Sequence, residues 1–591
     1  MRAVFSVCAA LVLAGCATTG GELVSEFTPS TLNNPRGAFS TYLSARFAAS
    51  DHDLKSAARY YGETLQKDPA NPTLLESAFF YSATSGDFAG AGAYAEKLVA
   101  ATPDDRSARL ALAVVALRNK DYAGARRHIA QSAKGPFTTL TVSLLDAWAA
   151  AAMNDKAAVE KDLQVLAGEK GAENIAAFHA GLLAEHTGNI EAAETAYKQA
   201  LRTSPTPRVV EAYGRMLERT GRGADAAALY RNHLGQGGFL PVVEPGLQRI
   251  ASKTRAEPLV STPAEGAAEA LFGLAASLTD ASSADMSVLY LRMAMHLRPD
   301  FALGQILLGD RFDQLRRFED AIAAYREVQP SSPYRRMAVM AMALDLMRLE
   351  QHDAAVVELR RLVAADPKDS EAWISIGDAY RAADKEAQAL EAFDRAVEAL
   401  GTPRARDWRV FYARANVKEK LKDWKAAEAD IQIALKLAPN EAQLLNYLGY
   451  SWVERGERLD EAMPMLERAS KLRPQDGFIM DSVGWAYFKL GRYEDAARTL
   501  GQAVLLEPGD PTINDHLGDA LWKVGKPIAA RYQWNHAITF GADSEAKARI
   551  EQKIRTGLPG EPTPGGAASV AVGTSPVLTP PASNTTPTSR R

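Results

Sequence analysis

Apolar residues return along the middle of this 591-residue chain with a period of about 34 residues. Alanine marks one phase of the period, at Ala321, Ala355, Ala389, Ala427, Ala462, Ala496 and Ala530. Proline marks the end of the period, at Pro299, Pro333, Pro367, Pro439, Pro474 and Pro508. Within each period the apolar residues are spaced three or four apart in two successive stretches, as one face of an α-helix requires. The pattern therefore predicts repeated pairs of amphipathic helices, each pair ended by a proline that cannot continue a helix.

The clearest period has small and large residues at fixed places: Trp373, Ile376, Gly377, Tyr380, Ala389, Phe393 and Ala396. The small residues let two helices cross closely, and the large ones fill the space around the crossing. This skeleton resembles the tetratricopeptide repeat, a helix-turn-helix unit. The resemblance implies an all-α solenoid, in which each unit buries its apolar face only by stacking on its neighbours.

Extending this register gives the expected organisation of the chain. About six repeats occupy residues 38–240, a Pro-rich joint covers 241–267, and eight repeats occupy 268–544, so that two superhelical arms are expected. A terminal helix follows at 545–556. Residues 557–591 are rich in Pro, Gly, Ser and Thr and nearly free of charge, which predicts a disordered tail.

The first residues have the pattern of an export signal. MRAVFSVCAALVLAGC has one basic residue, a short apolar core and small residues before Cys16. Leu13-Ala14-Gly15-Cys16 resembles a lipobox, which implies a signal peptide at 1–15, acylation of Cys16 and a lipidated linker at 16–37. An ordinary cleaved signal with a chance cysteine is the alternative. The Ala17 that follows the cysteine favours a location of the lipidated protein in the outer membrane, where it would face the periplasm.

Composition and motifs narrow the function. A formal net charge of -4 and a pI near 6.2 argue against a nucleic-acid partner. The histidines lack metal-ligand spacing, and no phosphate loop, nucleophile elbow or calcium loop is present. We therefore expect no catalytic residue, no metal site, no cofactor and no small-molecule substrate, and we expect a binding protein rather than an enzyme.

The first helix of each unit has a second face beyond the packing framework. In the unit that starts at Gly477, positions four, seven, eight and eleven are framework, whereas positions two, five, nine and twelve project about 120° away. In repeats of this kind that face lines a concave groove, and Met and aromatic side chains suit the binding of a peptide or a partner helix. The candidates are Met337, Met340, Leu344, Met347, Tyr412, Asn416, Asn446, Tyr450, Asp481, Trp485, Phe488, Asp515, Asp519 and Trp522. The alternative is that positions five and nine pack against neighbouring first helices.

The C-terminal third resembles a particular family. LLNYLGYSWVERGERLDEAMPMLERASKLRPQDGFIMDSVGWAYFKLGRYEDAARTL and INDHLGDALWKVGKPIAARYQW are similar to the LbcA-like tetratricopeptide-repeat lipoproteins of the bacterial outer membrane and, more distantly, to NlpI-like lipoproteins. The resemblance implies a scaffold that binds a carboxyl-terminal processing protease and presents peptidoglycan hydrolases to it, held to the membrane by a lipid anchor. A structural component of an envelope assembly or polysaccharide-export complex is the alternative.

Overall fold

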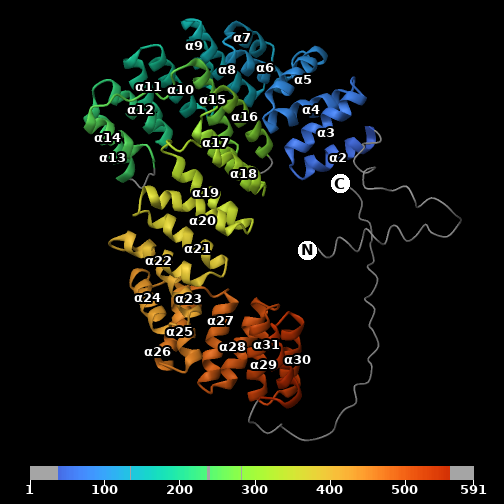
Figure 1. The fold of residues 1–591 in the computed structure, drawn as a ribbon, viewed down its shortest axis with the longest axis vertical. Coiled ribbons are helices and arrows are strands. Elements are labelled where there is room, and N and C mark those ends of the chain that lie inside the picture. Colours follow the sequence, from blue (N-terminus) through green and yellow to red (C-terminus); the bar gives the residue numbers. More distant parts are fainter. Residues whose placement is uncertain (1–37, 134, 236–239, 281–282, 559–591) are drawn as a thin grey trace, which may run out of the picture. The chain divides into compact units, whose positions relative to one another are not determined.

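The computed structural model describes residues 38–558, apart from 134, 236–239 and 281–282. The expected signal peptide, Cys16, the linker to residue 37 and the tail from 559 onward lie outside the described residues. Within them the chain forms thirty α-helices and one short 3-10 turn, with no strand (Figure 1). The all-α solenoid class predicted from the period is thereby confirmed.

The chain divides into two compact units, one ending at Asp366 and the other beginning at Pro367. The helices of the first unit are α2 (Ala38–Ser50), α3 (Leu54–Lys67), α4 (Pro72–Ser85), α5 (Phe88–Ala101), α6 (Arg106–Arg118), α7 (Tyr122–Ala130), α8 (Pro136–Ala152), α9 (Lys156–Gly168), α10 (Glu173–His186), α11 (Ile190–Thr203), α12 (Pro207–Arg219), α13 (Gly223–Gly235), α14 (Val243–Ser252), α15 (Pro263–Ser277), α16 (Ala284–Leu297), α17 (Ala302–Gln314), α18 (Phe318–Arg326), α19 (Arg335–Arg348) and α20 (His352–Ala365).

The helices of the second unit are α21 (Ser370–Ala382), α22 (Glu386–Leu400), α23 (Trp408–Lys420), α24 (Trp424–Leu437), α25 (Ala442–Arg455), α26 (Leu459–Leu472), α27 (Gly477–Lys489), α28 (Tyr493–Leu506), α29 (Pro511–Lys523), α30 (Pro527–Thr539) and α31 (Ser544–Thr556), with the 3-10 turn at Ala405–Asp407. Within the second unit consecutive helices pack in pairs, and each pair packs on the next.

The turn inside a pair repeats the same local chemistry. An Asp or Asn side chain caps many second helices, as Asp53 accepts a hydrogen bond from the backbone N–H of Ser56. The residue before that cap takes a left-handed conformation, as at Gly86 (φ 95°) and Lys120 (φ 63°). Short loops of fixed geometry thus join the helices and keep the spacing near 34 residues.

Close crossing of the two helices explains the small residues of the pattern. A Cβ atom added at Gly377 would lie 2.6 Å from the Phe393 ring, and one added at Gly518 would lie 2.4 Å from the Trp534 ring. Both aromatic side chains are fully buried. Glycine therefore allows a large ring of the second helix to seat against the backbone of the first.

The Pro-rich segment at 241–267, expected as a joint between two arms, lies inside the first unit. It contains α14 and leads into α15, and α15 and α16 pack against α4, α6 and α8, the first helices of the N-terminal pairs. The Arg292 guanidinium donates to the Thr84 carbonyl (3.1 Å), and the rings of His296 and Phe88 stack at 4.4 Å. The segment is a return after which the chain's own helices pack on that face, and its apolar residues Leu259 and Val260 are themselves buried.

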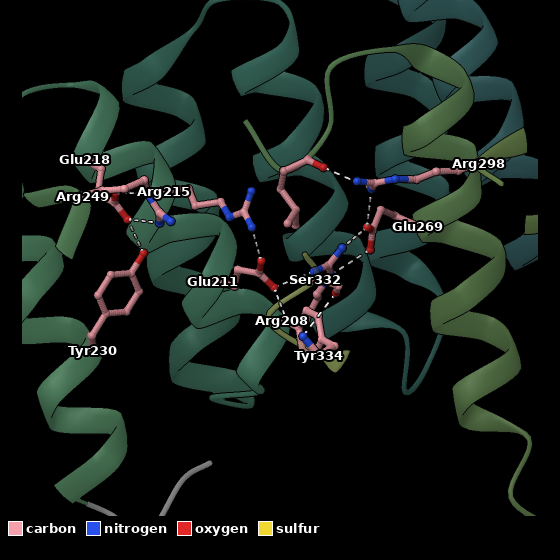
Figure 2. A network of polar contacts seen from close by, with 11 residues as sticks. Arg208, Glu211, Arg215, Glu218, Tyr230, Arg249, Glu269, Arg298, Ser332 and Tyr334 are labelled. Atoms are coloured by element: carbon pink, nitrogen blue, oxygen red, sulfur yellow. Dashed lines mark hydrogen bonds and ion pairs between the residues drawn. The ribbon is translucent and has the colours of Figure 1, made fainter. Parts of the chain in front are cut away.

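A buried ionic network connects the start of α12, α15 and the start of α19 in the first unit (Figure 2). Arg208 pairs with Glu211 (2.6 Å) and with Glu269, and Arg215 pairs with the same Glu211 (2.7 Å). The Tyr334 hydroxyl donates to Glu211 (2.8 Å). Burial alone would raise the pKa of Glu211, but the guanidinium groups of Arg208 and Arg215 hold it below its usual value. Each buried charge thus depends on its partners.

A second buried carboxylate makes the first unit sensitive to pH. Asp345 is 1 % exposed; burial, and then the nearby Asp313 carboxylate, raise the pKa of Asp345 to about 7. In the unfolded chain this carboxyl group titrates near pH 4. Between these values the unfolded chain has released a proton that the folded chain retains, so stability falls as pH rises from about 4 to about 7.

We therefore expect Asp345→Asn to flatten this dependence. At pH 8 the variant should be more stable than the parent by about 1–2 kcal/mol, since it no longer holds a second charge beside Asp313, and at pH 5 the two should match. Urea unfolding at both pH values measures the difference. Asp300→Asn, at a carboxylate 73 % exposed, is the control and should show no such change. Equal effects of the two substitutions would contradict the assignment.

Candidate functional site

The first helices of the second unit carry the face predicted to bind a partner. On α27, Ile479 and Val483 are buried against neighbouring helices, and the Asp476 side chain caps its first turn by accepting from the N–H groups of Phe478 and Ile479 (both 3.1 Å). This cap fixes where the helix begins and therefore which side chains face outward.

A hollow of about 610 Å³ lies along α23, α25 and α27. Four predicted residues line it: Tyr412 from α23, Asn446 and Tyr450 from α25, and Asp481 from α27. The other lining residues include Tyr447, Phe478, Gln443, Ser451, Ser482, Glu419, Glu454, Arg455, Arg473 and Asp476. We call this hollow the α25 groove. Its tyrosines are held in place, since the rings of Tyr412 and Tyr447 meet edge to face at 5.6 Å.

Most charged groups of the α25 groove are already paired within the chain. Glu419 accepts from the Tyr447 hydroxyl and lies 3.5 Å from Arg455, and Arg473 pairs with Glu441 at 2.9 Å. The lining nonetheless holds four carboxylates against the guanidinium groups of Arg455 and Arg473, which disfavours an acidic ligand.

Uncharged polar groups remain for a ligand. The Gln443 side chain is exposed, and the Asn446 side chain also lines the hollow, although its Oδ1 atom is itself buried and has no hydrogen-bond partner in the described part of the chain. Burial, and then Glu454 and Asp481, raise the pKa of Tyr450, so its hydroxyl stays neutral and can donate. Amide and hydroxyl groups beside aromatic rings suit the main chain of an extended peptide.

Trp485 and Phe488 occupy the predicted face but are packed against other side chains. Trp485 is 9 % exposed; its ring stacks on Phe488 at 4.7 Å and on His516 of α29 at 4.0 Å, and its indole N–H donates to Glu454. Asp481, at the floor of the groove, contacts His516 at 3.0 Å. These contacts match the alternative interpretation, in which the residues at positions five and nine pack against the first helix of the next unit.

The candidates on α29 are covered by α31. The Lys553 ammonium donates to Asp515 (2.9 Å) and Asp519 (2.8 Å), and Trp534 donates to Asp519 (2.9 Å). Trp522 is 3 % exposed and packs against Trp534. The last pair is therefore closed by the terminal helix at this face.

The remaining candidates lie elsewhere. Met337, Met340, Leu344 and Met347 are on α19 in the first unit, where Leu344 is 47 % exposed and the methionines are half-buried. The Asn416 amide donates to the Tyr412 carbonyl in its own helix (2.9 Å) and does not line the α25 groove. The structure thus brings together Tyr412, Asn446, Tyr450 and Asp481, and not the whole predicted strip.

Two groove residues were not among the candidates. Tyr447 follows Asn446 at position six of its unit, and Phe478 stands at position two of the next unit. Phe478 is 54 % exposed, an unusual exposure for a phenylalanine. Position two already belongs to the predicted face, so Phe478 could have been selected there, whereas Tyr447 requires reading aromatic residues at position six as well.

Among the described residues no group of three or more His, Cys, Asp or Glu side chains has the arrangement of a metal site. In the same part of the chain no helix combines the length and the apolar character needed to cross a membrane.

The fold and the groove define an all-α repeat protein with a surface suited to protein partners. The chain belongs to the tetratricopeptide-repeat family: the family's model matches residues 83–137, 178–241, 340–402, 412–477 and 484–545, more than half of the chain. Such repeats serve as scaffolds for protein–protein interaction and are generally non-catalytic.

Similar proteins share only parts of their length with this chain. The TPR repeat-containing protein PA4667 of Pseudomonas aeruginosa is 36 % identical over 113 residues, which is 19 % of each chain. Human aspartyl/asparaginyl beta-hydroxylase is 28 % identical over 126 residues, 20 % of this chain and 16 % of its own. The chain thus spans under a fifth of the length of these curated relatives. Among solved structures, the Cut9 and Hcn1 hetero-tetramer of APC/C covers 88 % of this chain and 97 % of the matched chain, at 16 % identity and a TM-score of 0.36.

Proposed function

We propose that this protein is a lipid-anchored scaffold facing the periplasm, which holds an extended segment of a protein partner in the α25 groove. The partner we propose is a carboxyl-terminal processing protease, with peptidoglycan hydrolases as the proteins presented to it. The observation that carries the binding site is the hollow lined by Tyr412, Tyr450 and the side-chain amides of Asn446 and Gln443.

Elsewhere in the chain, first helices are covered by other helices of the same chain, which supports the α25 groove as the binding site. In the first unit α15 and α16 pack against the first helices α4, α6 and α8, so that face is already covered by the chain itself. In the second unit α31 covers the corresponding residues of α29. The α25 groove lies on first helices that carry neither cover. Its aromatic and amide lining matches the requirements of an extended backbone.

The protease adaptor role rests on the sequence resemblance, and the groove supplies its mechanism. Binding one segment of the protease would fix its position without any chemistry by the scaffold. The local concentration of the protease would then rise wherever the scaffold is anchored.

Groove variants test the binding site. Tyr450→Ala and Asn446→Ala should each weaken binding of a purified carboxyl-terminal processing protease about tenfold, since each removes a contact worth about 1–2 kcal/mol. Tyr532→Ala, at a tyrosine 60 % exposed on α30, is the matched control and should leave the affinity unchanged. Equal affinities for all variants would remove the groove from the proposal.

The anchor has its own test. Cys16→Ser should move the protein from the membrane fraction to the soluble periplasm and abolish labelling by palmitate, because the thiol that carries the acyl chains is gone. Palmitate labelling that persists in Cys16→Ser would contradict the lipobox interpretation while leaving the groove untouched.

A further inference from the structure

The first described helix presents bulky apolar side chains to solvent. On α2, Phe39 and Phe47 are each 73 % exposed and Leu43 is 50 % exposed, whereas the small residues Ala45 and Ala48 are buried. The exposed residues are spaced by four and therefore form one stripe. The end of a repeat array normally carries a polar outer face, so this stripe indicates that something covers α2.

The next repeat shows what covers the same stripe there. Residues 34 positions later lie on α4, where Phe47 corresponds to Tyr81. The ring of Tyr81 stacks on Tyr61 of α3 at 5.2 Å, with 2° between the ring planes. At this position a first helix is thus covered by the second helix of the preceding pair, whereas Phe39 and Leu43 correspond to the polar residues Thr73 and Ser77.

The same register continues upstream of α2. Subtracting 34 from Ala57, Tyr61 and Pro69 gives Leu23, Phe27 and Pro35. An apolar residue, an aromatic residue and a terminating proline therefore stand where a preceding second helix would have them. Pro29 interrupts this stretch and limits a helix to the residues before it.

The surroundings of the stripe are mixed in charge. A hollow of about 420 Å³ lies beside it, lined by Leu43, Phe47 and Tyr60 and by the carboxylates of Asp51 and Asp53 among others. Arg46 donates to the Tyr42 hydroxyl, and Arg59 lies over the Tyr60 ring and interacts electrostatically with Asp53. The upstream segment carries Glu22 and Glu26, whose spacing by four places both carboxylates on one side, so the apolar side with Leu23 and Phe27 is the one that would face the stripe.

We propose that residues 22–28 are the remnant of a preceding repeat and dock on α2, with Phe27 stacked on Phe47 as Tyr61 stacks on Tyr81. About ten residues join this segment to α2, which gives an effective concentration in the millimolar range. A second copy of the chain fits the stripe less well. The exposed area is on the order of 400 Å², about half of what each partner of a stable dimer contributes.

The docked segment would set the distance from the anchor. If Cys16 is acylated, only residues 17–21 remain as a free spacer between the acyl chains and the folded array. The docking itself depends neither on the anchor nor on the proposed partner.

Photo-crosslinking tests the proposal on the full mature chain. With p-benzoylphenylalanine in place of Phe47, irradiation of the membrane-bound protein should give an intramolecular crosslink to residues 22–28, located by mass spectrometry. Phe27→Ser should reduce its yield at least fivefold, and Phe27→Tyr should preserve it. The same photo-reactive residue in place of Phe540, which is 43 % exposed on the second unit, is the control and should not label residues 22–28.

The other outcomes each overturn the proposal. Crosslinks from position 47 to lipid chains would assign the stripe to the bilayer, and crosslinks to a second copy would make it a dimer interface. Labelling of another protein, or the absence of any crosslink to residues 22–28, would equally exclude the docked segment.

Discussion

Trp485→Ala is expected to lower the free energy of unfolding of the second unit by about 3–5 kcal/mol, the usual cost of removing a buried tryptophan. The side chain is 9 % exposed and lies between the rings of Phe488 and His516. Its removal leaves a cavity at the junction of α27 and α29 and deprives Glu454 of its indole donor. Urea unfolding followed by circular dichroism measures the loss.

Tyr450→Ala separates packing from binding. Tyr450 is half-buried on the α25 groove, packs on the core cluster only in part, and its hydroxyl makes no hydrogen bond to another described residue, so its removal should cost only about 1–2 kcal/mol. The expected pattern is therefore a large loss of stability for Trp485→Ala and a small one for Tyr450→Ala. Equal and small losses would place Trp485 on a binding surface instead of in the core.

Glu211→Ala is expected to destabilise the first unit by about 3–5 kcal/mol, because it leaves the buried Arg208 without one of its two carboxylate partners. Glu211 is 1 % exposed; it also pairs with Arg215 and accepts a hydrogen bond from the Tyr334 hydroxyl (Figure 2). Its loss therefore disconnects α12 from the start of α19. Thermal and urea unfolding of the purified chain report this change.

Tyr334→Phe provides the matched control for the network. It removes a single hydrogen bond to Glu211 and keeps the ring and every ion pair, so a cost of about 1 kcal/mol is expected. A cost for Glu211→Ala no greater than that of Tyr334→Phe would mean that solvent compensates Arg208 and that the network is dispensable.

The sequence predicted the repeat because its signals are local. Gly377 and Phe393 sit at fixed separation inside one unit, and their contact follows from helix geometry alone. The return of α15 and α16 onto α4, α6 and α8 could not be predicted in this way. Contacts such as that of Arg292 with Thr84 join residues 208 positions apart and leave no periodic trace.

The candidate site was predictable only in part for a related reason. A face of a first helix can be identified from its 100° spacing, so Tyr412, Asn446 and Tyr450 were predicted to share one surface, and they line one hollow. Whether a residue on that face contacts solvent or the next helix depends on how neighbouring units stack. Trp485 is covered by His516 and Asp519 by Lys553, and neither partner can be assigned from one unit alone.

The self-covered surfaces have a functional consequence. α15 and α16 pack on the first helices of the N-terminal pairs, and α31 packs on α29. Our proposal therefore assigns the partner to first helices of the second unit that carry no such cover among the described residues, which would restrict binding to a defined stretch of the repeats.

Equilibrium binding of a purified carboxyl-terminal processing protease to the full chain tests the central claim most directly. The account predicts saturable binding that weakens about tenfold for Tyr450→Ala and for Asn446→Ala, with unfolding curves close to the parent and with Tyr532→Ala unchanged. Absence of binding by the parent chain would contradict the proposed partner. Binding that is equally strong in the groove variants would contradict the α25 groove as the site.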